Sequence, residues 1–158
     1  MLVPVRQATM ITLSTTLTFS GHDVPFDEIT RLVGVRPTRL RRRAEFPNPA
    51  LGADQWAFRT QGTYPIPEDG AEAGREWSYP DVMTQLRHIQ SLVGDRAEQV
   101  GAWCRAHDVR ALFQVVIQAD TEELPMMTLP SDFVSFACAL GASVDFDVYV
   151  NVAEPAQE

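Results

Sequence analysis

The segment from Ile11 to Phe19 alternates between hydrophobic and polar residues with a period of two. Successive side chains of a β-strand point to opposite faces, so one side of this segment is apolar and the other carries hydroxyl groups. The apolar side consists of Ile11, Leu13, Leu17 and Phe19, and the polar side of Thr12, Ser14, Thr16 and Thr18. The pattern predicts a half-buried strand in a sheet that has one covered face.

Further strands are expected at residues 55–60, 75–79, 110–118 and 143–150. The last of these places Val144, Phe146, Val148 and Val150 on one side and Asp145, Asp147 and Tyr149 on the other. The strands at 55–60 and 75–79 would form a hairpin around the loop from Gln61 to Gly74. This loop is longer than the ~2–5 residues usual for hairpins, and its role stays open.

Helical spacing of apolar residues follows the first strand and recurs twice later in the chain. Phe26, Ile29 and Val33 predict a short helix that Gly34 would end. Residues 81–107 read as two helices interrupted at Gly94, where Asp95 and Glu98 would form a capping box. A final helix is expected from Pro130 to Leu140, and residues 39–54 are expected to be irregular.

The predicted element order is β-α-β-β-α-β followed by a further α-β unit. The first six elements match a ferredoxin-like arrangement, which the last two would extend. We therefore expect an α+β fold with a mostly antiparallel sheet and helices on one face. The 158 residues suit one domain, 1–158, with an ordered core at about residues 8–151 and a tail at 152–158.

If the helices cover one face, the other face is polar and forms a candidate binding surface. Its candidate residues are Thr16, Gln114, Asp145, Asp147 and Tyr149. Such a face can bind a ligand or partner, or it can simply face water. Asp145 and Asp147 could also hold a metal or act as acid and base, or they could form salt bridges with arginines of other strands. The three histidines lie on other elements, so no metal site or catalytic set is nominated, and no cofactor is expected.

A second candidate site is an arginine cluster after the first helix. It comprises Arg36, Arg39, Arg41, Arg42 and Arg43. Guanidinium groups pair bidentately with carboxylates and phosphates, so the cluster could bind a small anion or a nucleotide. The alternative is a solvated loop neutralised by nearby acidic residues such as Glu45, Glu68 or Glu72.

The charge of the whole chain bears on its partners. The net charge is −8 and the pI about 4.8, which disfavours nucleic-acid binding and favours basic partners. All thirteen basic residues are arginine, so lysine-based catalysis is excluded. Cys104 and Cys138 are expected to be buried free thiols of a reducing compartment. No signal peptide or membrane-spanning segment is recognisable, so a cytoplasmic protein is expected.

Three separated motifs resemble a known family. The segment from Phe26 to Thr38, the pair Trp56 and Trp77, and the stretch from Leu129 to Tyr149 are similar to those of domain-of-unknown-function family 4279, an uncharacterised bacterial family. The resemblance covers roughly Thr12 to Val150 and implies no catalytic residues. It implies an association with toxin immunity or defence, which concerns gene context and not chemistry.

The sequence thus favours a non-catalytic protein-binding domain, with an immunity-type inhibitor of a basic toxin as one form. The first alternative is a regulatory domain that binds a small anion or nucleotide at the arginine cluster. The second is a metal-assisted hydrolase that uses Asp145 and Asp147. An exposed edge strand would also allow a homo-oligomer.

Overall fold

The computed structural model describes residues 10–65, 82–120, 124–125 and 127–151. Within them, five strands form one sheet in the spatial order β2-β3-β1-β4-β5. The strands are β1 (Met10–Gly21), β2 (Arg39–Arg41), β3 (Asp54–Pro65), β4 (Arg110–Ala119) and β5 (Ala142–Val150). All neighbouring strands are antiparallel except β4 and β5, which are parallel.

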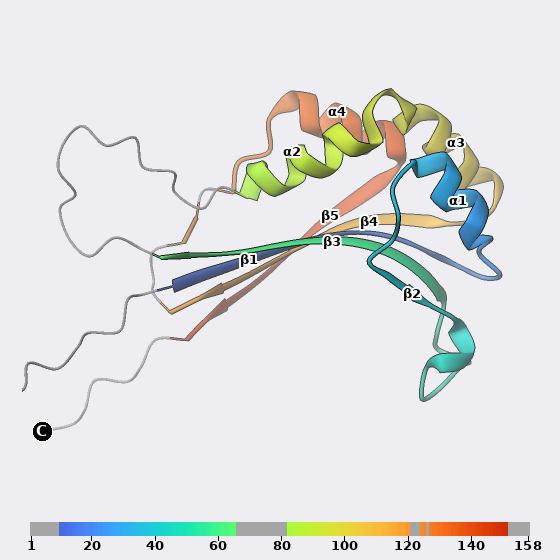
Figure 1. Ribbon diagram of the computed structural model, residues 1–158, viewed down its shortest axis with the longest axis horizontal. Helices are drawn as coiled ribbons and strands as arrows, with labels where there is room; N and C mark the ends of the chain where they lie inside the picture. Colours follow the sequence, from blue (N-terminus) through green and yellow to red (C-terminus); the bar gives the residue numbers. More distant parts are fainter. Residues whose placement is uncertain (1–9, 66–81, 121–123, 126, 152–158) are drawn as a thin grey trace, which may run out of the picture.

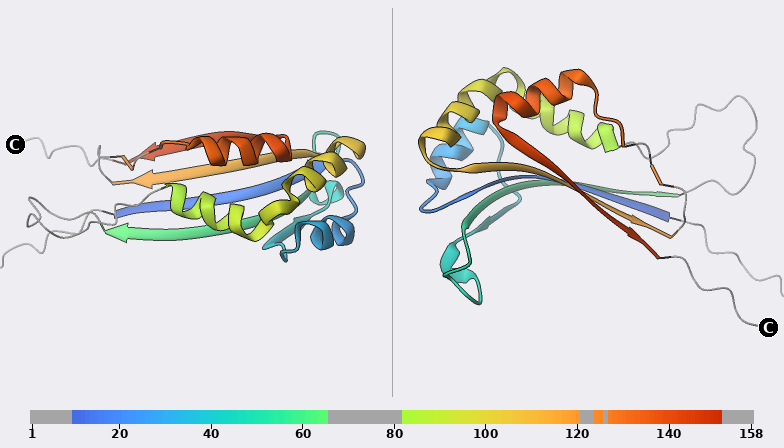
Figure 2. Two further views of the ribbon diagram at one scale, coloured as in Figure 1. Left: turned by 90° about the horizontal axis from the view of Figure 1, so that it is seen from above. Right: turned by 180° about the vertical axis from the view of Figure 1, so that it is seen from behind.

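The helices lie on one side of this sheet, as Figures 1 and 2 show. They are α1 (Phe26–Val33), α2 (Val82–Val93), α3 (Ala97–Ala106) and α4 (Ser131–Leu140). The predicted α+β class, the mostly antiparallel sheet and the single helical layer are confirmed. We call the sheet surface opposite these helices the open face.

The alternation in β1 explains this one-sidedness. Ile11, Leu13, Leu17 and Phe19 are at most 1% exposed and pack under the helices. They meet the buried apolar stripes of the helices, such as Phe133 and Leu140 of α4. Because burial of apolar surface drives folding, a strand with a single apolar side accepts helices on that side only.

The predicted helix ends at Gly34 and Gly141 are confirmed, whereas the predicted capping box at the start of α3 is wrong. Gly34 and Gly141 follow α1 and α4 in the left-handed conformation, with φ of 77° and 66°. The capping box expected from Asp95 and Glu98 is absent: a 3-10 turn at Gly94–Arg96 leads into α3, and no side chain caps its first turn. Gly94 is in the left-handed conformation with φ of 61°, so the helical path is interrupted at Gly94, as predicted.

Several strand predictions need correction or lie outside the described residues. Strand β3 runs five residues beyond the expected end at Thr60, to Pro65, and so uses part of the predicted loop. The segment 39–54 is not wholly irregular, because it contains β2 and a 3-10 turn at Arg43–Glu45. The strand predicted at 75–79 lies outside the described residues, and the ferredoxin-like order is not confirmed. Among the described helices, none is long and apolar enough to cross a membrane.

Candidate binding surface on the open face of the sheet

The strand register brings the predicted face residues together in cross-strand rows. Residues paired across neighbouring strands point to the same face. Arg59 of β3 pairs with Thr16 of β1, Thr16 pairs with Gln114 of β4, and Gln114 pairs with Asp145 of β5. These four residues form the central row of the open face, so three of the predicted residues lie in one line with Arg59.

The next row carries the second aspartate. It consists of Gln61, Ser14, Val116 and Asp147. Two side-chain hydrogen bonds join this row to the central one. Arg59 Nε donates to Ser14 Oγ at 2.7 Å, and Gln114 Nε2 donates to Asp147 Oδ2 at 2.8 Å. Two rows of side chains are thereby held in fixed relative positions.

Opposite charges lie on opposite sides of the open face. Arg39 and Arg41 of β2 share this face, because they pair with Ala57 and Gln55 of β3. With Arg59 they make the β2–β3 side basic, whereas Asp145 and Asp147 make the β5 side acidic. Arg59 and Asp145 are three strands apart, about 14 Å at the usual strand spacing. Neither forms an ion pair in the described part of the chain.

The middle of the open face is partly apolar. Leu112 and Val116 of β4 lie there and are half-buried. At the end of β5, the predicted face residue Tyr149 is 54% exposed. An apolar centre with a charged rim is the usual anatomy of a protein–protein interface.

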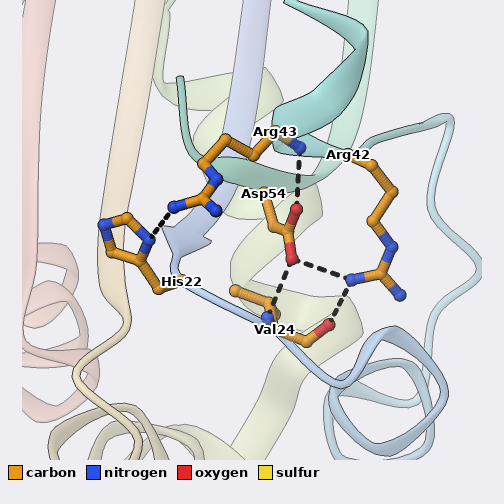
Figure 3. Close-up of polar contacts among 5 residues, drawn as sticks. All are labelled: His22, Val24, Arg42, Arg43 and Asp54. Carbon is orange, nitrogen blue, oxygen red and sulfur yellow. Dashed lines mark hydrogen bonds and ion pairs between the residues drawn. The ribbon is translucent and has the colours of Figure 1, made fainter. Parts of the chain in front are cut away.

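The arginines of the cluster do not converge on one site. Arg42 Nη1 donates to Asp54 Oδ2 at 2.8 Å and to the Val24 carbonyl at 2.9 Å (Figure 3). The Arg42 guanidinium also lies 3.8 Å above the centre of the Phe26 ring. Arg42 therefore joins β3 to the start of α1 through Nη1, and the Asp54 carboxylate offsets its charge.

The other arginines of the cluster point to different neighbours. Arg43 Nη1 lies 2.9 Å from His22 Nδ1, and the Arg41 guanidinium lies 3.7 Å above the Phe46 ring. Arg39 is exposed on the edge strand β2. Arg39 and Arg41 thus belong to the open face, and Arg42 and Arg43 belong to the contacts around Asp54. The fifth arginine, Arg36, is exposed between α1 and β2.

Asp54 is the buried acidic residue that the sequence reasoning missed. Burial alone raises the pKa of its carboxyl. The backbone N–H of Arg43, the guanidinium of Arg42 and the backbone N–H of Val24 outweigh that effect, so the pKa of Asp54 is lowered from 3.8. Asp54 stays ionised and neutralises Arg42. The sequence assigned this role to acidic residues such as Glu45, because no local pattern links Asp54 to its distant partners.

The remaining candidates do not form a second chemical site. The described residues contain no group of three or more His, Cys, Asp or Glu side chains that could hold a metal ion. Cys104 is buried as expected, but Cys138 is exposed, so that prediction was wrong for one of the two thiols. Trp56 is fully buried, and its indole N–H donates to Thr30 Oγ1 at 2.8 Å. It is thus a core residue, and Trp77, the other tryptophan of the family motif, lies outside the described residues.

A groove of about 420 Å³ lies in the helical layer between α1 and α3. Its walls are Glu28, Arg31, Leu32, Arg96, Gln99 and Trp103. Three of these residues take part in hydrogen bonds: Trp103 Nε1 donates to Glu28 Oε1 at 2.7 Å, and Arg96 donates to the carbonyls of Leu92 and Val93. These contacts tie α3 to α1 and close the end of α2.

Comparison with known protein families gives a match that spans the described sheet and its helices. A family model described as a domain of unknown function (DUF4279) matches residues 11–151. No curated protein and no solved structure matched the chain.

Proposed function

We propose that this chain, which belongs to the DUF4279 family, is a non-catalytic protein-binding domain that uses the open face of its sheet. The observation that supports the proposal is the arrangement of Arg59, Thr16, Gln114 and Asp145 in one row on the surface opposite the four α-helices. A rigid sheet presents these groups at fixed spacings, which lowers the entropy cost of binding.

The charge pattern of this face bears on the kind of partner. The net charge of −8 favours a basic partner, but the described open face carries arginines at one edge and aspartates at the other. A partner that offers both signs of charge would match the whole face, whereas a uniformly basic partner would match only the β5 side. Complementary charge patterns mainly set the specificity and the rate of encounter.

The alternatives from the sequence have less support. Anion binding at the arginine cluster has less support because Arg42 is paired with Asp54, and Arg41 and Arg43 contact different neighbours. Metal-assisted hydrolysis would need a third ligand beside Asp145 and Asp147, and the described residues offer no such group. A role in toxin immunity stays a prediction.

Affinity capture from the native host with paired variants tests the proposed surface. The open-face variant combines Asp145→Arg with Tyr149→Ala. The matched control combines Glu98→Arg with Val134→Ala, which change exposed residues of α3 and α4. We expect the wild type and the control to capture a partner to the same extent. The open-face variant should capture less of it, by on the order of tenfold or more. Equal capture by the open-face variant would overturn the proposal.

A further inference from the structure

We infer that the open face pairs with the open face of a second copy of this chain, in a two-fold symmetric dimer. The inference rests on the proposed function and names its partner. It follows from the positions of the charges: when a second copy of the face is rotated by 180° onto the first, its acidic side meets the basic side of the first copy. Symmetric dimers use the same patch on both subunits, so a self-complementary patch is what they require.

The geometry can be followed row by row. A two-fold axis that runs along the strands, between β1 and β4, turns the face over and exchanges β3 with β5 and β1 with β4. Because the axis follows the strands, each row stays in register with itself. In the central row, Asp145 of one copy then lies opposite Arg59 of the other, and Thr16 lies opposite Gln114. The ion pair forms twice, once on each side of the axis.

The adjacent row fits the same operation. It places the carboxylate of Asp147 opposite the amide of Gln61, which can donate a hydrogen bond to it. Leu112 and Val116 of β4 lie close to the axis, beside their symmetry copies. The apolar centre therefore falls in the middle of the dimer and the charges fall at its rim.

Within one copy the charges cannot satisfy one another. Arg59 and Asp145 are held about 14 Å apart by two intervening strands, far beyond ion-pair distance. The Arg59 Nε group is occupied by Ser14, which fixes the side chain across the face. Asp145 is exposed and takes part in no ion pair among the described residues. Each group is thus positioned without an opposite charge, which a second copy would provide.

The size of the face agrees with this partner. Four strands of 9 to 12 residues and the three-residue β2 cover on the order of 700 Å² per copy, close to the standard size of about 800 Å² per partner for a specific interface. Charge pairing at a solvent-accessible rim predicts that the dimer weakens as salt rises.

Charge exchange with sedimentation velocity tests the dimer. The variants of the full chain are Arg59→Asp, Asp145→Arg and the double variant, compared with the wild type over a protein concentration series at low salt. Each single change puts like charges opposite each other and should weaken dimerisation on the order of tenfold or more. The double variant restores an opposite-charge pair and should dimerise within about threefold of the wild type, as expected for a directly coupled pair.

Matched controls are Arg105→Asp and Glu98→Arg, which reverse exposed charges on α3 and should leave dimerisation unchanged. Thermal melts check that every variant is folded. The inference would be overturned if the wild type stayed monomeric, or if the dimer dissociation constant did not change in the Arg59 and Asp145 variants. A monomer that still captures another protein through the open face would refute self-pairing alone, whereas a monomer without such capture would refute the proposed function as well.

Discussion

Arg59 and Asp145 occupy the same cross-strand row of the open face, separated by Thr16 and Gln114. One is basic and the other acidic, and the sheet keeps them too far apart to pair within one molecule. This relationship links the amino-acid sequence to a function, because period-two alternation puts both residues on the uncovered side.

Replacing Asp54 with Asn should destabilise the fold by about 2 kcal/mol, because hydrogen bonds to a buried charged group are lost and Arg42 keeps no acidic partner. The Asp54 side chain is 6% exposed. Asp132→Asn is the matched control, since its ion pair with Arg87 is 54% exposed on both sides. It should cost less than about 0.5 kcal/mol. Urea unfolding of both variants measures the difference, and equal effects would contradict the role of Asp54.

The same carboxyl predicts a pH dependence. Its pKa is lowered in the folded protein, so its stabilising effect is fully present above the ordinary value of 3.8 and is lost as pH falls through the lower folded pKa. The difference in unfolding free energy between wild type and Asp54→Asn should therefore shrink below about pH 4. A difference that stayed constant down to acid unfolding would argue against an ionised Asp54.

Thr15→Val should stabilise the protein by about 1 kcal/mol. The Thr15 side chain is fully buried, and its hydroxyl has no hydrogen-bond partner. Thr60→Val should have the opposite effect, because the Thr60 hydroxyl donates to Gln85 Oε1 at 3.1 Å and Gln85 is 6% exposed. Thermal unfolding of the two variants compares them. A loss of stability in Thr15→Val would mean that its hydroxyl has a partner.

Gly101→Ala should destabilise the protein by about 2 kcal/mol through overpacking. A Cβ atom at this position of α3 would lie 2.1 Å from the carbonyl oxygen of Ala139 in α4. Helix propensity alone predicts the reverse sign, a gain of about 1 kcal/mol. A measured increase in melting temperature would thus contradict the close approach of α3 and α4.

The two thiols should react at very different rates. Burial raises the pKa of Cys104 to about 11, whereas Cys138 is exposed. A thiol reagent at pH 8 should modify one cysteine quickly and the second only after denaturation, because the thiolate is the reactive form. Cys138→Ser should remove the fast reaction. Two fast thiols in the native wild type would show that α3 does not shield Cys104.

The amount that could be predicted from sequence differs between elements. Alternating residues in β1, β4 and β5 predicted both the strands and their faces, because burial on one side imposes that period. Strand β2 was missed: it has three residues, two of them arginines, and only its pairing with β3 makes it a strand. The bond between Arg42 and Asp54 was missed for a similar reason, since it depends on how the chain folds back.

The candidate surface was predictable in part. That Thr16, Gln114, Asp145 and Asp147 share a face follows from the alternation of side chains along each strand. The row that joins Asp145 to Arg59 does not, because it needs the strand order and the register. Separation of charge across the face therefore becomes visible only in three dimensions.

Hydroxyl-radical footprinting of side chains at low and high protein concentration, compared by mass spectrometry, tests the central claim most directly. The account predicts that Tyr149, which is 54% exposed, becomes protected as the concentration rises. Val134 on α4, which is 47% exposed, should be oxidised equally at both concentrations. Protection of Val134 with unchanged oxidation of Tyr149 would place the contact on the helical layer and contradict the account.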